Sequence, residues 1–155
     1  MNPTRLDRVF IFEDQLSFLI PHEWIEGDEE GNNYLYHAPD TDSGWLRASL
    51  LTLKNTSREK LRELFNEKAM QRCGDLCETG DNLIVAWKQT SEEDGIPISN
   101  YWWAVGHSSG PTLCHEALFS YTILHERLEE PETQEALSLV AKLVADATFA
   151  APKIA

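Results

Sequence analysis

The architecture of this chain follows from two consecutive runs, Ser99-Asn-Tyr-Trp-Trp-Ala-Val-Gly-His107 and Leu113-Cys-His-Glu-Ala-Leu-Phe-Ser-Tyr-Thr-Ile-Leu-His125. Aromatic and β-branched residues dominate both runs, which favours strands, and the turn Ser108-Ser109-Gly110-Pro111 joins them. The second run is apolar on both alternating faces, with Leu113, Ala117, Phe119, Tyr121 and Ile123 on one and Cys114, Leu118, Thr122 and Leu124 on the other. Such a strand is expected in the middle of a sheet that is covered on both sides.

Five further strands are predicted from short apolar or alternating runs. They are Arg8–Phe12, Leu16–Ile20, Tyr34–His37, Trp45–Leu53 and Asn82–Thr90. The intervening stretches Gly74–Asp81 and Ser91–Gly95 are predicted to be a loop and a turn, and the residues from Ala150 onward a fraying tail. Every connection is short, which favours one domain spanning residues 1–155 with mainly antiparallel pairing.

Two helices complete the pattern. Thr56 and Glu59 have the spacing of a capping box, and the apolar stripe that follows predicts a helix ending near Gly74. Pro131 suits the first turn of a second helix with a broad apolar stripe. The predicted fold class is α+β: a mainly antiparallel sheet of about six to seven strands covered by two helices.

The charge of the chain is strongly negative. Its 26 acidic and 13 basic residues give a formal charge of −13, which argues against nucleic acid or an anionic membrane as partners. Six of the basic residues fall between Lys54 and Arg72 beside only three acidic ones, so this segment carries about +3. Two interpretations of the segment stay open: a solvated helix or a basic docking face.

Targeting signals and cysteines indicate the compartment. The N-terminal residues lack the apolar core of a secretory signal, and no apolar run approaches the ~20 residues of a membrane span. Three cysteines are an odd number and no disulfide framework. We therefore expect a cytoplasmic protein with reduced thiols, and its oligomeric state stays open.

A resemblance enters at Phe18-Leu-Ile-Pro21-His-Glu-Trp24, where a buried strand ends in proline and a tryptophan folds back. Together with the central helix, the long antiparallel strands and the closing helix, this arrangement resembles the PsbP-like α/β sandwich. That fold is shared by extrinsic photosystem proteins, a nuclear-import factor that binds the Ran GTPase and bacterial families of unknown function. The resemblance covers nearly the whole chain as an architecture, and it implies a protein that acts through binding.

No catalytic constellation is evident. Glycine-rich phosphate loops, dinucleotide fingerprints and nucleophile elbows are missing from the sequence. Cys73 and Cys77 have an atypical spacing for zinc, and Cys114 and His115 are adjacent on a strand, so their side chains must point to opposite faces. We predict no catalytic residues, no metal and no cofactor.

The aromatic residues are the most suggestive binding candidates. Tyr101 and Trp103 lie on one face of their strand and Trp102 on the other, and Trp24, Trp45 and Trp87 are candidates to lie nearby. Core packing explains most buried aromatics, whereas tryptophan is also the residue most enriched at interface hot spots.

Three polar residues join these candidates. His107 and His115 straddle the turn as an expected cross-strand pair. Glu116 is the one carboxylate within a strongly apolar strand. It is either a buried, tuned acid, or it is exposed at a strand edge or paired with Arg47 or Lys88.

Two functions follow from these residues. The favoured hypothesis is a non-enzymatic cytoplasmic protein-binding module, whether adaptor, chaperone-like or immunity-like. It would bind a protein partner, which its charge suggests is basic, through an aromatic sheet surface with an acidic rim. The candidate binding residues are Tyr101, Trp102, Trp103, His107, His115 and Glu116. The alternative is a small-ligand-binding or hydrolytic domain with a pocket near Trp103, His107 and His115. Glu116 would join that pocket only where the strand twists, since it alternates to the opposite face.

Overall fold

The computed structural model describes residues 5–27, 33–39 and 44–150 of the chain. These residues form ten strands, two α-helices and one short 3₁₀-helix. In chain order they are β1 (Leu6–Ile11), β2 (Leu16–Pro21), β3 (Ile25–Gly27), β4 (Tyr34–His37), β5 (Trp45–Lys54), α1 (Arg58–Arg72), β6 (Asp75–Thr79), β7 (Asn82–Glu93), β8 (Ile96–Gly110), β9 (Leu113–Leu124), η1 (His125–Arg127), α2 (Pro131–Ala145) and β10 (Thr148–Phe149).

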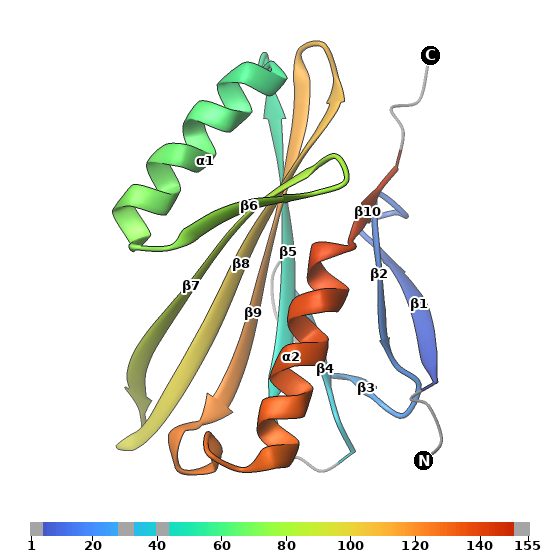
Figure 1. Cartoon of the computed structure of the whole chain (residues 1–155). Coiled ribbons are helices and arrows are strands. Elements are labelled where there is room, and N and C mark those ends of the chain that lie inside the picture. Colours follow the sequence, from blue (N-terminus) through green and yellow to red (C-terminus); the bar gives the residue numbers. More distant parts are fainter. Residues whose placement is uncertain (1–4, 28–32, 40–43, 151–155) are drawn as a thin grey trace.

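The strands form two antiparallel sheets (Figure 1). The larger sheet has seven strands in the order β3-β4-β5-β9-β8-β7-β6, and the smaller one has the order β1-β2-β10. β9 lies at the centre of the seven, and β8 and β9 are the two runs whose sequence predicted a doubly covered strand pair. The α+β class, the antiparallel pairing and the two covering helices are confirmed.

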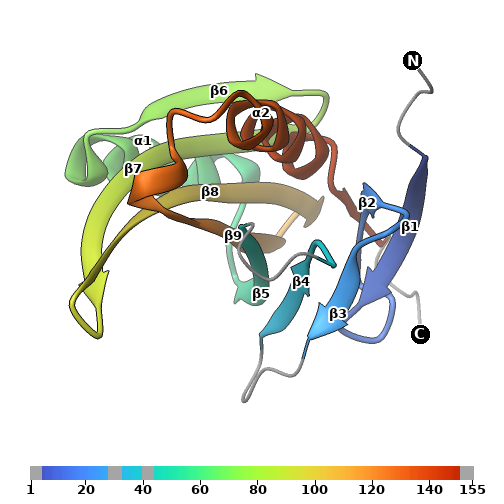
Figure 2. The same ribbon diagram turned by 90° about the horizontal axis from the view of Figure 1, so that it is seen from below.

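One face of the large sheet, which we call the α2 face, is closed. It packs against α2 and the three-stranded sheet, as the view from below shows (Figure 2). Phe119 on β9 meets Phe18 on β2 edge to face at a centroid distance of 5.2 Å, and both rings are buried. Trp24 stacks on Tyr121 at 6.1 Å, so the tryptophan after Pro21 folds back onto the sheet as expected.

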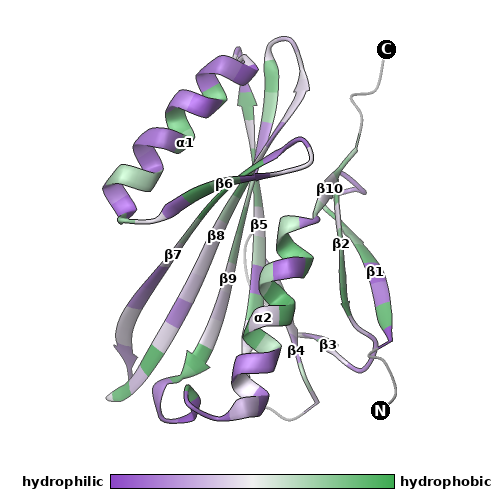
Figure 3. Ribbon diagram, viewed as in Figure 1, coloured by the Kyte–Doolittle hydropathy of each residue, from purple (hydrophilic) through white to green (hydrophobic). Residues whose placement is uncertain are grey.

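The opposite face, which we call the α1 face, is covered at one end only. Leu61 and Phe65 of α1 pack on Leu83, Val85 and Ala104 in a second, smaller core. Along its outer side α1 is mainly hydrophilic, whereas α2 turns hydrophobic residues toward the sheet (Figure 3).

A glycine sets how closely α1 approaches the sheet. A Cβ built on Gly106 of β8 would lie 2.6 Å from Cζ of Phe65, far inside van der Waals contact. The missing side chain therefore makes room for the Phe65 ring to lie directly on the strand.

The first helix begins one residue later than the capping box predicted. The side chain of Ser57, not Thr56, accepts a hydrogen bond from the backbone N–H of Lys60 at 3.1 Å, while the Thr56 hydroxyl donates to the carbonyl of Lys54. The two hydroxyl residues are adjacent in the sequence, and the position at which β5 ends determines which of them caps the helix. The predicted end near Gly74 is confirmed, with Cys73 in the left-handed conformation (φ 53°).

Several predicted loops are strands. Gly74–Asp81 contains the edge strand β6. Its mostly polar sequence did not predict a strand, because neither face of an edge strand has to be apolar. β7 extends to Glu93 and β8 begins at Ile96, so the predicted turn is reduced to Asp94 and Gly95. Both residues have positive φ, as a tight hairpin requires. β3 and β10 are too short to show an alternation of apolar and polar residues in the sequence.

Candidate functional site

β8 distributes its consecutive aromatic residues over both faces of the sheet. Trp103 points into the closed α2 face and is 6% exposed, whereas Trp102 lies on the α1 face and is partly exposed. Tyr101 shares the α2 face with Trp103, pairs across the strands with Tyr121, and has the Lys88 ammonium 5.4 Å from its ring centroid. The predicted division of the three aromatics between two faces is confirmed, and of the three Trp102 is the one on the less covered face.

The uncovered part of the α1 face is an aromatic surface. Trp87 on β7 and Trp102 on β8 are cross-strand neighbours whose rings stack at a centroid distance of 6.0 Å and an angle of 7°. Arg72, the last residue of α1, places its guanidinium 5.4 Å from the Trp87 ring centroid. Both rings are partly exposed. We call this region, centred on Trp87, Trp102 and the neighbouring Leu118, the open sheet face.

One polar atom of this face lacks a partner. The indole N–H of Trp102 is buried and makes no hydrogen bond within the described residues. Its neighbours on β9 are better satisfied, since Thr122 donates to the Asn100 side chain at 2.7 Å. An unsatisfied buried donor costs about 1–3 kcal/mol, so the Trp102 ring is held by packing and stacking rather than by hydrogen bonding.

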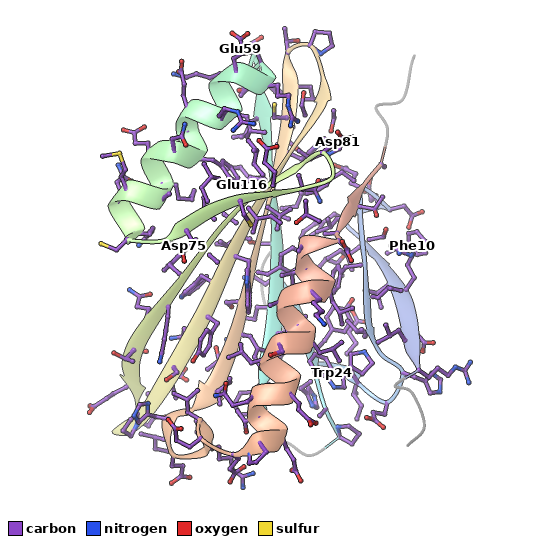
Figure 4. All side chains as sticks on the ribbon, in the orientation of Figure 1. Phe10, Trp24, Glu59, Asp75, Asp81 and Glu116 are labelled. Atoms are coloured by element: carbon purple, nitrogen blue, oxygen red, sulfur yellow. The ribbon has the colours of Figure 1, made fainter. Side chains whose placement is uncertain are left out.

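Glu116 also lies on the α1 face, beneath the helix (Figure 4). Its carboxylate is 3.3 Å from the ammonium of Lys68, and only 15% of the Glu116 side chain is exposed. The carboxylate is thus paired with a cation, but the partner is Lys68 of α1 and neither of the two predicted partners, Arg47 and Lys88. Lys68 and Glu116 are partners because the spacing of α1 places position 68 on the same side as Leu61, Leu64 and Phe65.

A cavity of about 290 Å³ adjoins this ion pair. Leu53, Leu64 and Phe65 form its apolar lining, and the side chains of Lys68, Arg72 and Glu116 reach it from two sides. We call this cavity the α1 groove. Arg72 borders both the α1 groove and the Trp87 ring, so the groove and the open sheet face are continuous.

His107 and His115 form the expected cross-strand pair on the α2 face. Both rings stack on Phe149 of β10, at centroid distances of 5.1 and 6.2 Å. Nδ1 of His115 is 2.8 Å from the Ser109 hydroxyl. Burial lowers the pKa of both histidines, which favours their neutral form.

The tautomer of His107 follows from its partner. The Asn82 amide nitrogen donates to the carbonyls of Ala145 and Ala147, so the Asn82 oxygen is the atom that meets Nδ1 of His107 at 3.1 Å. Because a carbonyl oxygen can only accept, Nδ1 of His107 carries the proton. The histidines thus help to hold the end of α2 and β10 on the sheet.

The alternative pocket prediction combined Trp103, His107 and His115 with Glu116. The structure brings the first three to the α2 face, where Phe149 lies over both imidazoles, and places Glu116 on the α1 face. The four side chains do not converge on one site.

The cysteines occupy separate environments. Cys73 and Cys77 are exposed, and Cys114 is buried with its thiol donating to the carbonyl of Thr56 at 3.3 Å. Burial raises the pKa of the Cys114 thiol, so it is a poor nucleophile. Within the described ranges, no group of three or more histidine, cysteine or acidic side chains is arranged to hold a metal ion.

Acidic side chains gather at the end of the sheet that lies far from α1. Glu92, Glu93 and Asp94 are all exposed at the tip of the β7–β8 hairpin. A second acidic cluster of the sequence, Asp28–Glu30, lies outside the described residues. The open sheet face thus runs from a cationic border at α1 to an acidic hairpin tip.

Lys68 and Arg72 belong to the basic segment for which a docking face was one of two open interpretations, but they were not among the individual candidate binding residues. The signal was their i, i+4 spacing on the apolar side of a helix, where a cation is unusual, within the basic segment that ends at Arg72.

The two sheets and two helices in this order define the Mog1p/PsbP-like fold, which this chain adopts. No protein-family model matches the sequence, and no curated protein matches it. In the part of the chain that the structure describes, neither helix has the length and apolar character needed to cross a bilayer.

Three solved structures show the likeness. LpqN of Mycobacterium tuberculosis, described as involved in cell envelope biogenesis, superposes with a TM-score of 0.63 at 12% identity over 97% of this chain and 93% of its own. The Saccharomyces cerevisiae Ran-binding protein Mog1p superposes with a TM-score of 0.57 at 8% identity, over 96% of this chain and 97% of its own. A Bacteroides thetaiotaomicron protein gives 0.64 at 16% identity over 92% of this chain and 48% of its own, so this chain spans about half of that protein. At these identities the likeness establishes the fold alone.

Proposed function

We propose that this protein is a non-enzymatic, cytoplasmic protein-binding module that acts as an adaptor or in a chaperone-like or immunity-like role. Its partner binds the open sheet face, with a basic region against the acidic hairpin tip. The observation that carries the proposal is the stacked, partly exposed Trp87–Trp102 pair on a sheet face that α1 leaves uncovered.

Two further observations support it. Tryptophan is the residue most enriched among interface hot spots, and a rigid stacked pair loses little conformational entropy when a partner covers it. Mog1p has the same fold and is a Ran-binding protein, which supports protein binding as a role that this scaffold can serve.

The test is affinity capture from native extract with tagged protein, compared across three variants. Trp102→Ala removes half of the aromatic pair, and Glu92→Lys/Glu93→Lys reverses the charge of the hairpin tip. Phe10→Ala is the matched control, because Phe10 is an aromatic residue that is 60% exposed on β1, far from the open sheet face.

We expect one protein to be recovered at low salt, to be lost with Trp102→Ala, and to be reduced by the charge reversal. Phe10→Ala should leave recovery unchanged. A partner that Trp102→Ala still captures at the wild-type level would show that the open sheet face is not the binding surface.

A further inference from the structure

We propose that the α1 groove binds a short peptide segment of the protein partner in which a large apolar side chain is flanked by carboxylates. This inference rests on the proposed function and deepens it, because it names the chemistry that the partner must present beside the open sheet face.

The size and lining of the α1 groove suit one anchoring side chain. Its volume of about 290 Å³ lies at the lower edge of the range for ligand pockets, roughly 300–1,000 Å³. Leu53, Leu64 and Phe65 form an apolar floor, which favours a leucine, methionine or phenylalanine side chain over a polar one. Leu51 lies two residues before Leu53 on β5 and is 54% exposed. It therefore extends the apolar surface of the floor to solvent.

The charge at one end of the groove suits an acidic flank. Glu67, Lys68, Arg72 and Glu116 all line the groove, two of each sign. Glu116 and Lys68 pair with each other at 3.3 Å, which leaves Glu67 and Arg72. Of these two, Arg72 lies beside the open sheet face, over the Trp87 ring, and it makes no ion pair with any carboxylate of the described residues.

An arginine on an aromatic face is well prepared to receive a carboxylate. A guanidinium placed over a ring can still donate from its N–H groups, and a carboxylate can accept two parallel hydrogen bonds from them. α1 holds five basic and three acidic residues in a chain of charge −13. The inference gives the Arg72 end of this basic segment a docking role.

The position of Arg72 also sets the direction of the bound segment. Arg72 lies where the groove meets the open sheet face, and Glu92, Glu93 and Asp94 lie at the far hairpin tip. A segment with its acidic, apolar-anchored end in the groove and its basic end toward the tip matches the charge at both ends. The reverse orientation places like charges together at both ends.

The experiment is a selection of random 12-residue peptides displayed on phage, performed on the intact protein and followed by counter-selection on Arg72→Glu. Enriched peptides are then synthesised, and their binding is measured by fluorescence anisotropy and by the tryptophan emission of the protein. Lys60→Glu is the matched control, because it makes the same charge reversal on an exposed position of α1 outside the groove. Leu53→Trp fills the apolar floor, and thermal melting verifies that every variant is folded.

We expect the enriched peptides to share an apolar residue next to aspartate or glutamate. Arg72→Glu and Leu53→Trp should each weaken binding at least tenfold, whereas Lys60→Glu should change it less than twofold. Replacing the peptide carboxylate by lysine should restore part of the affinity for Arg72→Glu. Failure to enrich any peptide, or enrichment of peptides that Arg72→Glu binds as well as the wild type does, would overturn the inference.

The same variants separate this inference from the proposed function. A natural partner that is lost with Trp102→Ala but retained at full affinity by Arg72→Glu and Leu53→Trp supports the open sheet face and refutes the α1 groove. A partner retained by all three variants refutes both.

Discussion

Both faces of the seven-stranded sheet carry aromatic residues, and β8 contributes to each, but the two faces use them differently. On the α2 face, Trp103, Phe119 and Tyr121 are at most 6% exposed, because they pack in the core beneath α2 and the three-stranded sheet. On the α1 face, one helix covers one end, and Trp87 and Trp102 remain partly exposed. Aromatic content therefore does not distinguish the buried face from the partly exposed one; the extent of the covering layer does.

The faces also differ in how their polar groups are satisfied. On the α2 face, Asn82 and His107 join in a network that ends on the backbone of α2, and burial raises the pKa of Tyr121 to about 12. On the α1 face, the indole N–H of Trp102 finds no hydrogen-bond partner among the described residues, and the Arg72 guanidinium lies over the Trp87 ring. We interpret the first as a finished core and the second as a surface that a partner can complete.

The largest effect should come from the closed face. Phe119→Ala removes a fully buried ring that packs on Phe18, and we expect it to lower the free energy of unfolding by about 3–5 kcal/mol. Urea unfolding measures the change. Phe10→Ala, at an exposed aromatic position, should stay within about 0.5 kcal/mol of the wild type. Similar losses for the two variants would contradict the description of the α2 face as the core.

An intermediate effect is expected where α1 meets the sheet. Gly106→Ala places a methyl group against the Phe65 ring, and this overpacking should cost about 1–3 kcal/mol. Gly110→Ala is the control, since an added Cβ there meets no atom within 4 Å. A second substitution, Phe65→Leu, should recover part of the loss in Gly106→Ala. Independent, additive losses would show that the two residues are not in contact.

The smallest effect should be the pH dependence that the histidine pair adds to stability. Burial lowers the pKa of His107 and His115 in the folded protein, so below pH ~6.5 the unfolded chain binds more protons than the folded one. Stability should therefore be complete above that pH and fall as the pH drops toward the folded-state pKa values. Urea unfolding between pH 7.5 and 5 measures the slope.

The control for this prediction removes the titrating groups. In His107→Gln/His115→Gln, the part of the slope that arises from the pair should vanish, while the contributions of the carboxylates remain. A wild-type slope in the double variant would show that the two imidazoles titrate alike in the folded and unfolded chains.

Much of the fold could be predicted because apolar residues recur with a clear periodicity along its main helices and strands. Alternation in β5, β7, β8 and β9 indicated the central sheet, and the apolar stripes indicated both helices. β6 and β10 could not be predicted, since a polar edge strand and a two-residue strand leave no periodic signal. The choice of Ser57 over Thr56 as the cap depends on where β5 ends, which local sequence does not state.

The candidate site was predictable only in part. Alternation along β8 and β9 assigned Trp102 and Glu116 to the face opposite His115, and the structure agrees. Which end of that face stays uncovered depends on the position of α1, and that position is set by a long-range contact between Phe65 and Gly106. For the same reason the sequence could not show that Arg72 reaches Trp87.

The order of the three-stranded sheet has a consequence for how the chain folds during synthesis. β2 lies between β1, its neighbour in the chain, and β10, which the ribosome adds after every other described strand. Until β10 emerges, one edge of β2 is unpaired and the two imidazoles lack the ring of Phe149. β5 must likewise wait for β9, from which α1 and three strands separate it, and such non-local pairing slows folding. Nascent chains that stall before Phe149 should therefore be recognised by chaperones and proteases as incomplete.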